Sequence, residues 1–179
     1  MMHLSYIFSS LLLSGIQITA CLAANSTTVN ADIKSISTLV TSLQDDVQYV
    51  AAGISGLSWA LQVQQDAIAL DDMINQGAKD ANASAAFGGG GSLDIGLSLI
   101  SLEPTITKTL QAVAAKNESF GDLGIIVQYS LTQLKADTDT FANAVVAKLD
   151  SLEGGIAPGV IASIDKAFES AIAAYENGA

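Results

Sequence analysis

Apolar residues recur at steps of three and four along most of the chain, the spacing that places side chains on one face of an α-helix. The clearest run spans residues 123–152, and its polar residues fall mostly on the other faces. Its apolar stripe consists of Leu123, Val127, Leu131, Leu134, Phe141, Val145, Leu149 and Leu152. The pattern predicts an amphipathic helix that must bury this stripe against other helices.

Comparable stripes predict helices over about residues 29–50, 57–83 and 95–113, and a shorter last helix after Pro158. No stretch shows the sustained alternation of apolar and polar residues that is typical of strands. Helices joined by short connections usually pack antiparallel. We therefore expect an all-α fold, a single-domain bundle of about five helices, of which four are long and one is shorter.

Proline and glycine place the expected breaks. The run over residues 95–113 keeps one apolar phase through Pro104, which predicts a single helix kinked at that proline. Four consecutive glycines at residues 88–91 predict a flexible loop, with a gate over a pocket as the minority interpretation. Gly154 and Gly155 are expected to end the helix of residues 123–152, and Pro158 to begin the last one. The polar residues 25–28 are expected to be loose.

Residues 1–23 have the pattern of a secretory signal peptide. An apolar run over residues 4–18 is followed by Cys21, Leu22 and Ala23, and small residues at Cys21 and Ala23 suit cleavage after Ala23. An uncleaved anchor is the alternative. We predict a secreted domain over residues 24–179, either extracellular or associated with a cell wall, and without a transmembrane anchor.

The residues left after removal of the signal peptide restrict the chemistry. They include no histidine, cysteine or arginine, which excludes Ser-His and Cys-His dyads and imidazole or thiolate metal sites. The net charge of −11 opposes nucleic-acid binding. Carboxylate pairs such as Asp71/Asp72 and Asp137/Asp139 are best interpreted as solvated helix faces. We expect no enzyme, no catalytic residues, no metal and no cofactor.

Three glycosylation sequons follow the signal peptide, at Asn25, Asn82 and Asn117. All three fall at the predicted N-terminal tail or at helix ends, where a glycan can reach solvent. They predict a glycoprotein.

The segment from Leu134 to Asp139, with Phe141 and Lys148, resembles the hallmark helix of the fungal hydrophobic surface-binding protein A family, which includes cell wall galactomannoproteins. Supporting segments are Asn30–Ile33, Lys79–Asn82, Pro104, and Ile164–Phe168 with Ala171–Tyr175. The resemblance implies a secreted helical domain that adsorbs to hydrophobic surfaces or holds a lipid, such as a fatty acid, among its helices.

We therefore expect a non-enzymatic extracellular or cell wall glycoprotein that binds lipids or hydrophobic surfaces, with a cell wall polysaccharide as a further candidate partner. The candidate lining residues are Leu43, Val47, Leu99, Ile106, Leu110, Val127, Leu131, Leu134, Phe141 and Phe168. Close packing of a core is the alternative for each of them. Two other functions stay open: a structural or antigenic cell wall mannoprotein without a small ligand, and a secreted effector that recruits another enzyme to a hydrophobic substrate.

Overall fold

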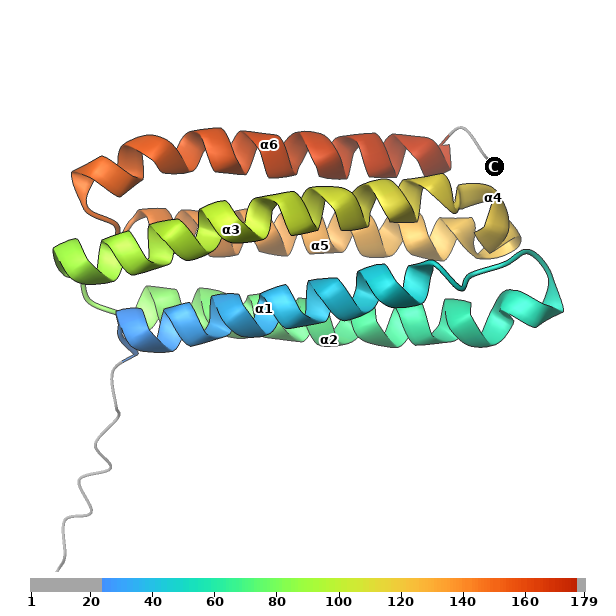
Figure 1. The fold of residues 1–179 in the computed structure, drawn as a ribbon, viewed down its shortest axis with the longest axis horizontal. Coiled ribbons are helices and arrows are strands. Elements are labelled where there is room, and N and C mark those ends of the chain that lie inside the picture. The colour runs from blue at the N-terminus through green and yellow to red at the C-terminus, as the bar shows by residue number, and fades with distance from the viewer. Residues whose placement is uncertain (1–23, 177–179) are drawn as a thin grey trace, which may run out of the picture.

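The computed structural model describes residues 24–176, which form an elongated helical bundle (Figure 1). Its five long helices are α1 (Ser26–Val47), α2 (Leu57–Ala83), α3 (Gly88–Ala115), α5 (Gly124–Val146) and α6 (Ser151–Glu176). One short helix, α4 (Asn117–Phe120), and two 3₁₀ turns, η1 (Ile54–Gly56) and η2 (Gly121–Leu123), belong to the connections. The fold is all-α, as predicted, although the last helix was wrongly expected to be the shorter one: it has 26 residues, more than α1 with 22 and α5 with 23.

The long helices form a ring. α1 packs against α2 and α3, α2 packs against α5, α5 against α6, and α6 against α3. Successive long helices run in opposite directions, so both the α2–α3 and the α5–α6 connections lie at the end where α1 begins (Figure 1). Five helices around one axis enclose a wider space than four do, and this geometry leaves room along the centre of the bundle.

The helices bury the apolar stripes that the sequence shows. In α1 the buried side chains include Val29, Ile33, Ile36, Val40 and Leu43, at steps of three and four. The N-terminal tail is more ordered than we expected. The Asn25 side-chain oxygen accepts hydrogen bonds from the backbone N–H groups of Thr27 and Thr28, at 2.9 and 3.1 Å, so that α1 begins at Ser26.

The prediction of a flexible loop at residues 88–91 was wrong, because all four glycines belong to the first turn of α3. Packing explains the difference. A β-carbon on Gly91 would lie 2.6 Å from the Ser26 hydroxyl oxygen, so only glycine lets α3 approach α1 this closely. The preceding Phe87 is buried and its N–H donates to the Lys148 carbonyl at 2.9 Å. These tertiary contacts outweigh the low helix propensity of glycine.

The predicted boundary between the last two helices was also wrong. α5 ends at Val146, and Gly154, Gly155 and Pro158 all lie inside α6. Ser92 of α3 stabilises the connection at residues 147–150, because its buried hydroxyl accepts a hydrogen bond from the Asp150 N–H at 3.0 Å. Leu149 and Leu152 therefore belong to the connection and to α6, and not to the stripe of α5.

Pro104 lies inside α3, and the helix continues through it as the shared apolar phase predicted. The bend at Pro104 stays a prediction. The predicted signal peptide, residues 1–23, lies outside the described residues. Among the helices of residues 24–176, none is long and apolar enough to cross a membrane.

Candidate functional site

A cavity of about 200 Å³ lies inside the ring and is lined by all five long helices. α1 and α2 contribute Ile36, Val40, Leu43, Leu70 and Ile74 to its inner wall. α3, α5 and α6, with Leu149 of the α5–α6 connection, supply the remaining lining residues. The cavity is thus the axial space that a five-helix ring leaves open.

The cavity reaches the surface between the first halves of α3 and α6. Its lining there includes large apolar side chains that are also exposed: Leu93, Leu97 and Ile100 on α3, and Leu152 and Ile156 on α6. Leu97 is 55% exposed and Leu152 is 73% exposed. We call these five residues the mouth. Apolar side chains at an opening reduce the cost for an apolar molecule to pass through it.

Eight of the ten residues predicted from the sequence lie along the cavity: Leu43, Leu99, Ile106, Leu110, Leu131, Leu134, Phe141 and Phe168. The other two do not line it. Val47 is fully buried near the end of α1, and Val127 is partly buried against the core. That the eight residues contact a ligand stays a prediction.

Sequence reasoning missed the mouth and most of the contribution of α6. Ile156, Val160, Ile161 and Ile164 line the cavity from α6. Their spacing continues the phase of Phe168 backwards across Pro158, a signal that was available in the sequence. This spacing is interrupted on paper by Gly154, Gly155 and Pro158, which predict a helix boundary, so the residues before Pro158 are not predicted to belong to the last helix.

Within residues 24–176, only three residues that line the cavity carry polar side chains: Thr109, Thr138 and Glu153. The buried Thr109 hydroxyl donates to the Thr105 carbonyl at 2.9 Å, one turn earlier in α3. The half-buried Thr138 hydroxyl makes no hydrogen bond to any residue of the described chain. Glu153 lies beside Gly96 at the mouth. The lining is otherwise apolar.

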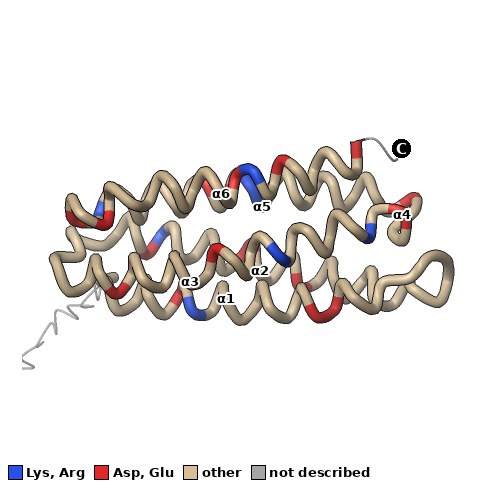
Figure 2. The backbone as a smooth tube through the Cα atoms, turned by 45° about the horizontal axis from the view of Figure 1, so that its top comes forward, with Lys and Arg blue, Asp and Glu red and all other residues tan. Residues whose placement is uncertain are grey.

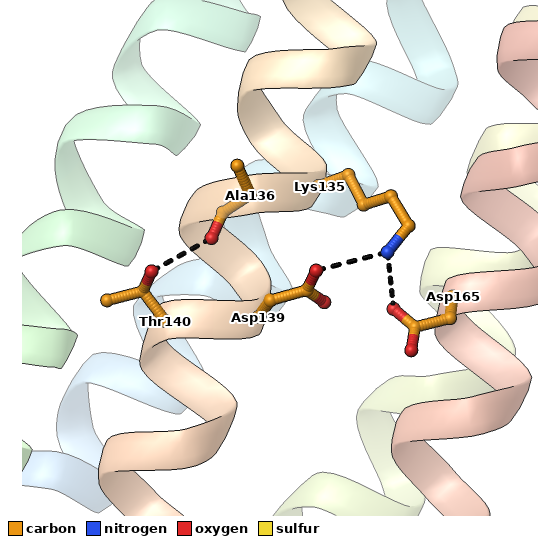
Figure 3. A network of polar contacts seen from close by, with 5 residues as sticks. All are labelled: Lys135, Ala136, Asp139, Thr140 and Asp165. Atoms are coloured by element: carbon orange, nitrogen blue, oxygen red, sulfur yellow. Dashed lines mark hydrogen bonds and ion pairs between the residues drawn. The ribbon is translucent and has the colours of Figure 1, made fainter.

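Lys135 and Asp139 of the hallmark segment do not line the cavity, and Lys135 ties α5 to α6. The Lys135 ammonium forms 3.0 Å ion pairs with Asp139, one turn further along α5, and with Asp165 of α6 (Figure 3). Hydrogen bonds to Asp165 and Asp139 raise the pKa of Lys135, which keeps the ammonium charged. The other charged residues are scattered along the helices, with long uncharged stretches between them (Figure 2).

Not all carboxylates lie on solvated faces, which corrects one expectation. Burial, together with the facing Asp80 of α2, raises the pKa of Asp32 to about 6. Burial and the neighbouring Asp137 of α5 raise the pKa of Asp71 on α2 to about 6. Both groups lie at helix–helix contacts. Over residues 24–176, no three acidic, histidine or cysteine side chains are grouped so that they could hold a metal ion.

The fold and the site define a class: small helical bundles that enclose an apolar cavity with an apolar mouth. Within that class, the hydrophobic surface binding protein A family matches this chain over residues 26–147. The chain belongs to that family, as the resemblance of its α5 segment indicated.

Solved structures share the fold. Afmp4p in complex with palmitic acid superposes with a TM-score of 0.80 at 26% sequence identity, over 84% of this chain and 99% of that chain. Ligand binding domain 1 of the Penicillium marneffei MP1 protein, complexed with arachidonic acids, has a TM-score of 0.77 at 18% identity, over 84% of this chain and 99% of that one. Ligand binding domain 2 of the same protein, complexed with multiple arachidonic acids, has a TM-score of 0.72 at 18% identity, over 81% and 92% of the two chains. A comparison with curated protein sequences found no match.

Proposed function

We propose that this protein binds a long-chain lipid in the cavity of the helix ring and catalyses no reaction. The observation that carries the proposal is the cavity itself, with a lining that is apolar apart from three side chains and a mouth of exposed Leu and Ile. The complex of Afmp4p with palmitic acid supports it, because that protein has the same fold.

The size of the cavity suits an alkyl chain. One water-sized group needs about 10–15 Å³, and the cavity measures about 200 Å³. It therefore has room for about 13–20 groups of methylene size. Burial of each methylene contributes about 0.8 kcal/mol before the costs of association are subtracted.

Two variants on one helix test the proposal. Ala142 of α5 lines the cavity, and Ala136 of the same helix is exposed. Ala142→Phe fills the cavity, whereas Ala136→Phe adds the same ring outside it. We expect Ala142→Phe to weaken binding of the neutral dye Nile red at least tenfold, and Ala136→Phe to leave it unchanged. A purified protein that yields no lipid on solvent extraction and also binds no Nile red would contradict the proposal.

Adsorption to hydrophobic surfaces is a second candidate, favoured by exposed apolar residues at the end of the bundle away from the mouth. Ile54 is 93% exposed in η1, and Ile125 and Tyr129 are over 70% exposed in the first turns of α5. Tyr49 and Trp59 stack nearby with ring centroids 4.6 Å apart. We call this set the far-end patch. A patch of this kind is a common feature of interaction sites.

Replacing part of the far-end patch separates the two candidates. Ile54→Gln with Ile125→Gln is expected to reduce retention on octyl-coated beads and to leave Nile red binding intact. Ala142→Phe is expected to reduce Nile red binding and to leave retention on octyl-coated beads intact. Unchanged retention of the double variant would exclude the far-end patch as the adsorbing surface.

We further propose secretion, with residues 1–23 as the signal peptide and residues 24–179 as the mature domain, and release or wall association in the extracellular space. Asn25 and Asn82 are exposed, and Asn117 is half-buried with its side-chain N–H donating to the Ala174 carbonyl at 3.0 Å. We propose all three as glycan sites. Intact mass before and after glycosidase treatment tests this, and an unchanged mass would refute it.

A further inference from the structure

The cavity offers no positive charge to a ligand. The chain has no arginine, and its one histidine, His3, lies outside the described residues. None of the seven lysines lines the cavity. Lys116 donates to two backbone carbonyls after the end of α1, Lys148 donates to two at the end of α2, and Lys135 is paired with two aspartates. An anionic head inside this cavity would therefore have no counter-ion.

Among the described residues that line the cavity, the one titratable side chain is an acid. Glu153 lies at the mouth on α6, and the lining residues contributed by α1, α2, α3 and α5 include no titratable side chain. A carboxylate near the mouth would meet this like charge, and a carboxylate deeper in the cavity would lie among apolar side chains. Burial without a partner disfavours the charged form of a carboxyl group, so the group takes up a proton instead.

One lining hydroxyl is available for a hydrogen bond. Thr132 and Thr140 of α5 donate to the carbonyls of Gln128 and Ala136, each at 2.9 Å. Thr138, on the same helix, makes no such bond and lines the cavity. Polar groups in protein interiors are nearly always paired. The Thr138 hydroxyl is half-buried, has no partner in the described chain and belongs to a residue that lines the cavity, so it is available to hydrogen-bond the polar end of a ligand.

We propose that the cavity selects long-chain lipids with an uncharged, hydrogen-bonding head, either a fatty alcohol or the protonated form of a fatty acid, and that Thr138 hydrogen-bonds that head. This inference rests on the proposed lipid binding and adds the class of head group. A hydroxyl or a protonated carboxyl can both donate to and accept from Thr138, and neither needs a cation.

The pH dependence of fatty acid binding follows from this selection. A free carboxyl group has a pKa of about 4.3. The bound acid is neutral, so its apparent affinity is full at low pH and falls by about tenfold for each pH unit above the pKa of the free acid. A fatty alcohol does not titrate in this range, and its affinity stays constant.

The experiment compares 1-decanol with decanoic acid as competitors for Nile red, at pH 5 and pH 8, on the full mature chain. We expect decanoic acid to bind at least tenfold more weakly at pH 8 than at pH 5, and 1-decanol to change less than twofold. Equal binding of decanoate and decanol at pH 8 would overturn the inference while leaving lipid binding intact. Displacement by neither compound, at either pH, would overturn the proposed function itself.

Variants test the roles of Thr138 and Glu153. The affinity of each variant for Nile red is measured first, so that the competition data can be converted to affinities for decanol and decanoate. Thr138→Val is expected to weaken decanol binding about three- to tenfold, whereas Thr138→Ser and the control Thr140→Val retain it. Glu153→Gln is expected to strengthen decanoate binding at pH 8, and the exposed Glu169→Gln is its charge-matched control. Equal decanol affinity of Thr138→Val and Thr140→Val would remove Thr138 from the site.

Discussion

Gly96 of α3 lies directly against Glu153 of α6, so that a β-carbon added to Gly96 would stand 3.2 Å from Glu153 Cγ. This contact joins the two helices that carry the mouth. A larger side chain at position 96 would fill the opening between Leu97 and Leu152 without disturbing the buried inner wall.

Gly96→Leu is therefore expected to reduce the association rate of Nile red at least tenfold and to leave the helical circular dichroism unchanged. Gly159→Leu is the control, because a β-carbon on Gly159, inside α6, meets no atom within 4 Å. Equal association rates in the two variants would show that the ligand enters elsewhere.

Gly77 of α2 gives a prediction about stability. A β-carbon at this buried glycine would lie 3.0 Å from the Phe141 ring, which is itself buried and lines the cavity. Gly77→Ala is expected to lower the free energy of unfolding by about 1–3 kcal/mol, because overpacking outweighs the better helix propensity of alanine. Gly159→Ala, at an open position, is expected to raise it by about 0.5–1 kcal/mol. Urea titration measures both, and stabilisation by Gly77→Ala would contradict the packing.

The ion pairs of Lys135 predict a salt-dependent contribution to stability. Lys135→Met keeps most of the apolar stem but leaves Asp139 and Asp165 as neighbouring carboxylates without their shared cation. We expect a loss of up to about 1 kcal/mol at low salt and a smaller loss in 1 M NaCl, since all three side chains are partly exposed. The exposed Lys166→Met on α6 is the control. Equal effects of both variants at both salt concentrations would show that the network adds nothing specific.

Asp32 predicts that the protein loses stability as the pH rises. Its side chain is buried, its Oδ2 atom finds no hydrogen-bond partner in the described chain, and its pKa is raised from 3.8 to about 6, first by burial and then by Asp80. The folded state therefore binds a proton more tightly than the unfolded state. The resulting stabilisation is present below about pH 4 and is lost as the pH rises through 6.

Asp32→Asn is expected to remove part of this pH dependence, with a higher melting temperature than the parent at pH 7 and a similar one at pH 4. Asp45→Asn, an exposed substitution on the same helix, controls for the change in net charge. A melting curve of Asp32→Asn that shifts with pH as the parent does would refute the assignment.

The sequence predicted helices wherever an apolar stripe was long. The buried positions of α1, from Val29 to Val47, follow steps of three and four, and the structure confirms them. Eight of the candidate cavity residues were found for the same reason, since residues on the inner stripes of a ring face its axis. An apolar stripe alone does not show whether its residues pack closely or line a cavity. The width of the space along the bundle axis depends on how many helices surround it, and the stripe of one helix does not report that number.

The boundaries failed where tertiary contacts decide local structure. Gly91 is helical because its lack of a side chain lets α3 meet Ser26, a contact between residues 65 positions apart. The break before α6 depends on Ser92, 58 positions from Asp150. Propensity rules assign both glycine segments, residues 88–91 and 154–155, to loops. The local sequence does not show that Ser26 and Ser92 lie against these parts of the chain.

The odd number of long helices has a geometric consequence for attachments to the two ends. α1 begins at the mouth end of the bundle, and α6 ends at the opposite end (Figure 1). A helix of 26 residues, the length of α6, spans about 40 Å at 1.5 Å per residue. Copies of this domain fused head to tail would therefore extend as a string, with each mouth nearer to the N-terminal end of its own unit. A fluorophore pair on Ser26 and Glu176 would span the length of one unit.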